Sequence, residues 1–250
     1  MVFERLVDDA ALGVSGVSAG EAVRAYRAFA GRSPVGRLRC PVSRFGELRR
    51  HLEPEDLLDL AVVADAGTDA LPGVLDGARG EPRVRPVSVH VALPPDADQA
   101  RAAAVAIARL PGDVPAFIGV RHRPGRLAAL DRIAAARGRG AALGVEFRAE
   151  DAAEFVPACR ERDLPFTCTA ARSAPGPLLR VVLLAAAAAP SDAARPGVLA
   201  DGVRGLDPGT AGAVRRVFAG FAVPDVAGLV AGLDDLGLVR TRDNGEHLSP

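Results

Sequence analysis

The chain contains no lysine and no tryptophan, and its 250 residues include three cysteines and one tyrosine. All 31 basic residues are arginine. Because there is no lysine side chain, no lysine Schiff base can form, which excludes that class of enzyme mechanism. A GC-rich genome accounts for the arginine bias without a functional cause.

The few cysteines carry no metal or disulfide pattern. Cys40, Cys159 and Cys168 are odd in number, and none belongs to a Cys-x-x-Cys pair. This spacing argues against a zinc ribbon and against a disulfide framework. Cys40 and Cys168 fall inside predicted strands, where a free cysteine behaves as a small buried hydrophobe. The four histidines are equally scattered, and no glycine-rich phosphate loop is present, so we expect neither a metal nor a cofactor.

Charge and hydropathy exclude two kinds of partner. The formal net charge is zero and the arginines are not interleaved with aromatic residues, so nucleic acid is not an expected ligand. The longest fully apolar run, Val181 to Ala189, is too short to span a bilayer. The first ten residues, MVFERLVDDA, carry acids where a secretory signal would be apolar. We therefore expect a cytoplasmic protein without a membrane partner.

Strand and helix patterns alternate along most of the chain. Short buried runs predict strands, and segments with apolar residues three or four apart predict helices between them. Two helices, Glu4–Leu12 and Ala19–Ala30, are expected first, the second capped by Ser18. The expected strands are Gly36–Pro41, Leu58–Asp65, Arg85–Leu93, Ala116–Arg121, Ala141–Phe147, Phe166–Ala170, a weaker Gly197–Val203, and Val217–Val223.

This order predicts one (β/α)8 TIM-barrel-like α/β domain over residues 1–250, irregular around its seventh strand. Residues 1–31 would form N-terminal helices and residues 240–250 a frayed tail. An open doubly wound sheet is the alternative architecture, made less favourable by the absence of a phosphate-binding fingerprint.

Polar residues follow one parity of the predicted strands and gather toward the C-terminal ends. In a barrel, alternate strand residues face the interior, and reacting groups lie at the C-terminal end. The expected polar cup consists of Arg39, Asp65, His90, Arg121, Glu146, Thr167 and Thr169. Glu146, His90 and Asp65 are the candidate catalytic acid–base groups, and the arginines and threonines are the candidate substrate-binding groups.

Structural roles for the same residues remain open. Strand-end charges also pair inside barrels without any chemistry, and a structural role for His90 is as consistent with the pattern as a catalytic one. The strands of Arg39 and Glu146 are numbered one and five, on opposite sides of an eight-stranded barrel. These two side chains therefore need not form an ion pair, and each could present its charge to a ligand between them. The alternative is that both are structural and buried in a polar layer of the core.

Three stretches resemble a functionally uncharacterised bacterial family of barrel-like proteins: GRLRCPVSRFGEL (36–48), FVPACRERDLPFTCTA (155–170) and VFAGFAVPDVAGLVAGLDDLGLV (217–239). In that family a lysine stands at the position of Thr167, and a Gly-Leu-His-His run follows the position of Ala170. The lysine arrangement is similar to that of class I aldolases of the deoxyribose-phosphate type. Here Ala171–Ala174 replace the run, so the resemblance implies a divergent paralogue without lysine chemistry.

Two classes of function follow. The first is a cofactor-independent enzyme that acts on a small molecule: a lyase, an isomerase or a cyclase. By analogy with actinobacterial gene clusters, such an enzyme would belong to a biosynthetic pathway. The second is a catalytically silent barrel that binds a ligand or partner. Whether the chain is an enzyme stays open, and a homodimer is compatible with either class.

Overall fold

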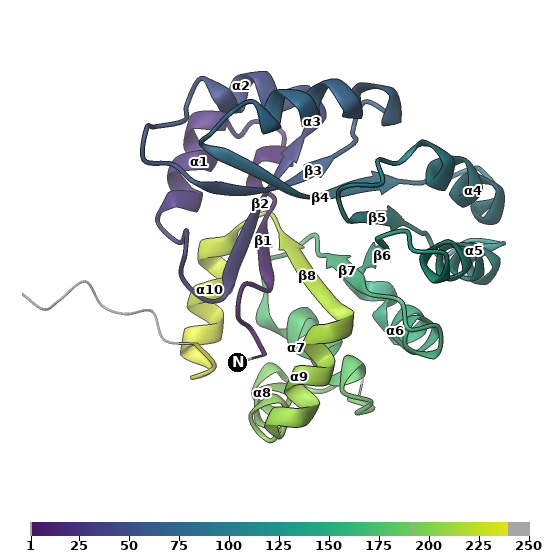
Figure 1. The fold of residues 1–250 in the computed structure, drawn as a ribbon. Coiled ribbons are helices and arrows are strands. Elements are labelled where there is room, and N and C mark those ends of the chain that lie inside the picture. Colours follow the sequence, from purple (N-terminus) through teal and green to yellow (C-terminus); the bar gives the residue numbers. More distant parts are fainter. Residues whose placement is uncertain (1, 192, 240–250) are drawn as a thin grey trace, which may run out of the picture.

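The computed structural model describes residues 2–191 and 193–239, and a closed barrel of eight parallel strands lies at its centre (Figure 1). Each strand pairs with the next one in the chain, and β1 closes the ring by pairing with β8. This confirms the predicted (β/α)8 barrel and excludes the open sheet. The strands are β1 Val7–Asp9, β2 Val35–Pro41, β3 Leu58–Val63, β4 Val84–Ala92, β5 Ala116–Gly119, β6 Leu143–Arg148, β7 Phe166–Thr169 and β8 Phe218–Val223.

Helices form an outer ring around the strands (Figure 1). The predicted cap at Ser18 is present, and Asp207 caps a later helix in the same way, because each side chain accepts a hydrogen bond from the backbone three residues on. The helices are α1 Ala19–Arg27, α2 Phe45–Arg49, α3 Leu71–Arg79, α4 Gln99–Arg109, α5 Arg126–Gly138, α6 Ala152–Glu161, α7 Pro175–Ala185, α8 Pro196–Arg204, α9 Pro208–Val217 and α10 Val226–Asp235. Single 3₁₀ turns occur at η1 Ala11–Gly13, η2 Val42–Arg44, η3 Thr68–Ala70 and η4 Ala149–Asp151.

The prediction of a helix over Glu4–Leu12 was wrong, because this segment supplies the first barrel strand. Val7 pairs with Val35 of β2 on one side and with Phe221 of β8 on the other. Without β1 the ring would be open between β2 and β8, leaving two strand edges unpaired. Pairing with two distant strands therefore overrides the local helical spacing of the segment.

The prediction of a seventh strand at Gly197–Val203 was also wrong, because the segment is helix α8. Pro196 occupies a first-turn position, where the missing N–H of proline has no cost. Leu199, Ala200 and Val203 are buried at helical spacing. Two helices, α8 and α9, thus separate β7 from β8, which accounts for the irregularity expected near the seventh strand.

The predicted frayed tail at 240–250 lies outside the described residues. Within residues 2–191 and 193–239, no helix has both the length and the apolar character that a membrane span requires.

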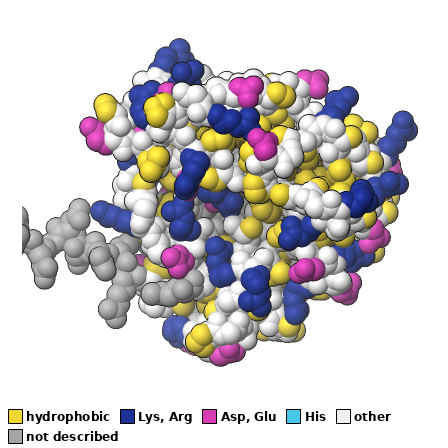
Figure 2. Space-filling view, viewed as in Figure 1, with side chains coloured by type: hydrophobic (Ala, Val, Ile, Leu, Met, Phe, Trp, Pro, Cys, Tyr) yellow, Lys and Arg dark blue, Asp and Glu magenta, His cyan; other side chains and the backbone are white. Residues whose placement is uncertain are grey.

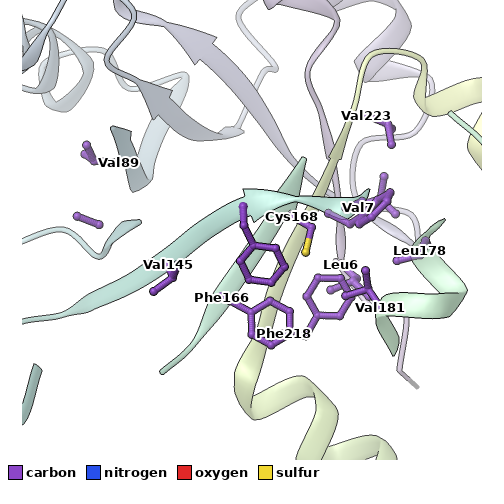
Figure 3. Close-up of a cluster of buried hydrophobic side chains, with 14 of the residues drawn as sticks. Leu6, Val7, Val89, Val145, Phe166, Cys168, Leu178, Val181, Phe218 and Val223 are labelled. Atoms are coloured by element: carbon purple, nitrogen blue, oxygen red, sulfur yellow. The ribbon is translucent and has the colours of Figure 1, made fainter. Parts of the chain in front are cut away.

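An apolar layer fills the space between the strands and the outer helices. Figure 3 shows Phe166 and Phe218 from neighbouring strands in the same cluster of buried side chains as Leu178 and Val181 of α7. The two phenyl rings stack with their centroids 5.1 Å apart. Such an aromatic pair contributes about 0.5–1.5 kcal/mol beyond the area that it buries. Cys168 lies in the same layer and is a free, buried thiol, as the sequence predicts.

The barrel interior is polar, unlike this outer layer. It contains ionised side chains from several strands, and small residues leave the space that they need. A Cβ atom on Gly220 of β8 would collide with the guanidinium of Arg37 and come within 2.8 Å of Asp8 Oδ2. The interior is therefore organised around charge pairs, and these position the candidate site.

Candidate functional site at the C-terminal end of the barrel

An ion pair between Arg39 of β2 and Glu146 of β6 crosses the barrel interior. Arg39 Nη1 donates to Glu146 Oε2 over 2.7 Å, and Nη2 donates to Oε1 over 3.2 Å. The sequence left open whether these two side chains pair, and in the structure they do. An eight-stranded barrel is just wide enough for its side chains to fill, so two long side chains from opposite walls meet in the middle.

His90, Ser88 and Thr167 extend this pair into a network. His90 Nδ1 lies 2.7 Å from Glu146 Oε2, and its Nε2 lies 3.1 Å from Ser88 Oγ. Thr167 Oγ1 donates to the same Glu146 oxygen over 3.3 Å. The ring of Phe117 stacks on His90 with centroids 5.2 Å apart and so fixes its plane. Glu146 thus accepts hydrogen bonds from three side chains of three other strands.

Charge pairing fixes the protonation states of the network. Burial raises the pKa of Glu146, but the Arg39 guanidinium and His90 outweigh this and hold it well below its usual range. Burial also lowers the pKa of His90, and the charge of Arg39 lowers it further. We therefore assign an ionised Glu146 and a neutral His90 that donates from Nδ1 and accepts the Ser88 hydroxyl at Nε2.

Hydroxyl, imidazole and carboxylate stand in the order of a Ser–His–acid triad, but their burial argues against that chemistry. Ser88 and His90 are each only 1% exposed. Ser88 precedes His90 by two residues on β4 and so lies deeper in the barrel. A nucleophile must reach its substrate, and neither residue borders the cavity at this end of the barrel. The arrangement stabilises the interior and holds Glu146 in place.

A cavity of about 300 Å³ opens at the C-terminal ends of β4 to β7, and we call it the C-terminal cavity. Glu146 links it to the buried network, since its side chain is 14% exposed and borders the cavity. Of the seven predicted cup residues, the cavity is bordered by Arg121, Glu146 and Thr169. Its wall also contains Ala92, Gly119, Val120, His122, Arg123, Phe147, Arg148 and Asp151.

The other four predicted residues do not border the cavity. Arg39, His90 and Thr167 are buried behind Glu146. Asp65 lies apart from them, exposed after the end of β3, where its carboxylate accepts hydrogen bonds from the backbone N–H and the hydroxyl of Ser43. Burial raises the pKa of Asp65, but these hydrogen bonds outweigh it and lower the pKa. The structure therefore gives Asp65 a local role in holding the loop after β2.

Sequence reasoning missed two residues of note. Ser88 shares the interior parity of His90 on β4, a signal that was present in the strand pattern. Asp9 ends β1 and was hidden by the wrong helix assignment. Asp9 is 2% exposed, and burial raises its pKa to about 6, aided by the charges of Asp225 and Asp8. A carboxyl of this kind takes up a proton near neutral pH, but Asp9 does not border the C-terminal cavity.

The described residues contain no group of three or more His, Cys, Asp or Glu side chains arranged to hold a metal ion. No protein-family model, curated protein or solved structure matches this chain. Membership of the uncharacterised barrel family and similarity to the class I aldolases therefore stay predictions. At the position where that resemblance implies a lysine, Thr167 donates to Glu146. The site must be interpreted from its own geometry.

Proposed function

We propose that the protein binds a small organic anion in the C-terminal cavity, without a metal or cofactor. One observation carries this proposal. Arg121 and Arg123 border the cavity, and within the described part of the chain neither guanidinium has a carboxylate partner. Arginine side chains bind carboxylate and phosphate groups through paired N–H donors. A volume of about 300 Å³ is at the lower end for small-molecule sites and suits a ligand of metabolite size.

Glu146 specifies a second feature of the ligand. Its Oε2 atom already accepts hydrogen bonds from Arg39, His90 and Thr167, whereas Oε1 accepts one from Arg39. Oε1 therefore has capacity for one more donor. The expected ligand carries a carboxylate or phosphate at one end and a hydroxyl or amino group at the other.

A calorimetric screen of small hydroxy acids, amino acids and phosphate esters tests this proposal. Arg121→Ala should weaken the binding of a hit about tenfold, the scale of one charge-assisted hydrogen bond. Asp65→Asn is the matched control, because Asp65 is also at this end of the barrel but does not border the cavity. Equal loss in both variants, or no binding at millimolar concentration, would contradict the proposal.

The second candidate is the cofactor-independent lyase, isomerase or cyclase. It is favoured by the position of an ionised carboxylate, Glu146, at the C-terminal end of the barrel, where barrel enzymes place reacting groups. The geometry limits its chemistry. A carboxylate with a strongly lowered pKa is a weak base, and His90 is too deeply buried to touch a substrate. Glu146 would orient the ligand and stabilise developing positive charge.

Proton NMR of each bound ligand over hours separates the two candidates. A new product signal supports the enzyme, and Glu146→Gln should then lower the rate about 10²-fold. Binding without any new signal supports the silent barrel. A product that forms equally fast with Glu146→Gln would remove Glu146 from the mechanism.

A further inference from the structure

A second and larger cavity, of about 990 Å³, opens at the opposite end of the barrel. We call it the N-terminal cavity, because its walls come from the first residues of β2, β3, β4 and β8. In the space-filling view of Figure 2, several basic side chains lie near the middle of the face that the figure draws. The cavity is bordered by Glu4, Arg5, Gly36, Arg37, Asp59, Arg85, Val87, Leu206, Pro208, Ala211, Gly212, Arg215 and Ala219.

One face of helix α9 creates the space. Pro208, Ala211, Gly212 and Arg215 border the cavity, and they share one face of the helix because Ala211 and Gly212 each lie three or four residues from Pro208 and from Arg215. A helix that packs on a barrel normally turns large apolar residues toward it. On this face of α9 the side chains are small, apart from one arginine. The cavity therefore results from the small side chains on this face of α9.

Arg37 and Arg215 are held in place by hydrogen bonds that do not use all of their N–H donors. Arg37 donates through Nε and Nη2 to the buried carboxylate of Asp8, at 2.7 and 2.8 Å, and through Nη2 to a backbone carbonyl. Its Nη1 takes no part in these bonds. Arg215 donates to the carbonyl oxygens of Phe218 and Glu4, at 2.6 and 3.1 Å. Both guanidinium groups are thus oriented before any ligand arrives.

Positive charge exceeds negative charge in the cavity. Arg5 and Arg85 share the single carboxylate of Asp59. Arg215 has only neutral carbonyl acceptors among its hydrogen bonds. Burial lowers the pKa of Arg215 and the charge of Arg37 lowers it further, and these two effects outweigh the opposing charges of Asp8 and Glu4. A half-buried guanidinium beside a second one is stabilised when an anion joins them.

We propose that the N-terminal cavity is a second ligand site, which binds a small organic molecule through a phosphate or carboxylate group seated between Arg37 and Arg215. The uncharged part of the ligand packs against Val87, Leu206 and Ala219. A volume of about 990 Å³ holds a molecule much larger than a bare phosphate ion. This site does not depend on the function proposed for the C-terminal cavity.

Phenyl phosphate and benzoate are suitable probes, because they carry the two anionic groups on the same apolar body. Benzyl alcohol is the uncharged control. Calorimetry at low salt should show millimolar or tighter binding of at least one anion and none of the alcohol. The tighter of the two probes identifies the anionic group. Absence of binding by both anions would overturn the proposal.

Arg215→Gln should weaken binding at least tenfold. The matched control is Arg216→Gln, which removes the same charge from the exposed neighbouring position of α9 and should change the affinity less than twofold. Equal weakening in both variants would show that the anion responds only to net charge, and would overturn the site.

A third variant removes the space and keeps every charge. Ala211→Phe places a phenyl ring in the cavity and should abolish binding while the circular dichroism of the barrel is unchanged. If Arg215→Gln fails to fold, the binding measurement on Ala211→Phe tests the proposal instead. Amide NMR shifts separate the two cavities, since a ligand here should move Gly212 and Ala219 rather than Gly119 and Thr169. Shifts confined to the second pair would overturn the proposal without affecting the C-terminal site.

Discussion

The two ends of the barrel use the same strand in different ways. Arg39 of β2 reaches across the interior and pairs with Glu146. Arg39 is buried, and the neutral His90 also donates to the Glu146 carboxylate. Arg37, two residues earlier, pairs with Asp8 on the adjacent strand, and Arg215 stands beside it without a carboxylate in its hydrogen bonds. Charge is thus balanced at the Arg39–Glu146 pair in the barrel interior, whereas positive charge is in excess around Arg37 and Arg215. The position of the acidic partner, rather than the arginine itself, determines whether a site is filled or left for a ligand.

The largest expected effect is at the Arg39–Glu146 pair. Arg39→Met should lower the free energy of unfolding by about 3–5 kcal/mol, because it leaves the buried Glu146 carboxylate without its cation. Arg37→Met should cost less, about 1–3 kcal/mol, because the charge of Arg215 still reaches Asp8. Urea denaturation at neutral pH measures both. Equal losses would show that Arg215 does not compensate Asp8 and would remove the contrast between the two ends.

A second comparison separates two neighbouring acids of β1. Burial raises the pKa of Asp9 from 3.8 to about 6. Because the folded pKa lies above the unfolded one, the protonated group contributes stability below pH 3.8, and this contribution is lost as the pH rises through about 6. Asp9→Asn should therefore stabilise the protein by about 1–3 kcal/mol near neutral pH and flatten this part of the pH profile.

Asp8→Asn should do the opposite and destabilise the protein at neutral pH, because Asp8 is the buried acceptor for Arg37. Thermal melts of both variants and of the wild type, at several values between about pH 4 and pH 8, provide the measurement. An Asp9→Asn variant that melts below the wild type at the upper end of this range would show that Asp9 is ionised and favourably paired.

The smallest expected effect comes from filling the space around the Arg37–Asp8 pair. Gly220→Ala places a methyl group against the guanidinium of Arg37 and 2.8 Å from Asp8 Oδ2, so it should cost about 1–2 kcal/mol through overpacking. Gly212→Ala is the control, because the nearest atom, Arg216 Nη1, is 4.0 Å away and alanine favours a helix. It should be neutral or stabilise α9 by up to about 1 kcal/mol. Equal effects of the two variants would mean that the Arg37–Asp8 pair moves freely.

Local sequence patterns were sufficient for most of the barrel. Buried runs such as Phe166–Thr169 and capped segments such as Pro208–Val217 carry their periodicity, cap and breaker residues within a few positions. The same alternation placed Arg39, His90 and Glu146 on interior faces, because side chains of a strand point to alternate sides. Lysine chemistry was excluded by composition alone.

The tertiary structure decided what these residues contact. Val7–Asp9 is too short for its sequence pattern to predict a strand. It forms one because it pairs with β2 and β8 and so closes the ring. Pairing of Arg39 with Glu146 depends on the width of the barrel and on side-chain length, which no local pattern contains. Asp65 lies outside the predicted cup because β3 ends at Val63, before Asp65, and the Asp65 carboxylate binds Ser43 instead. Local propensity determines elements, whereas distances across the chain determine which charges meet.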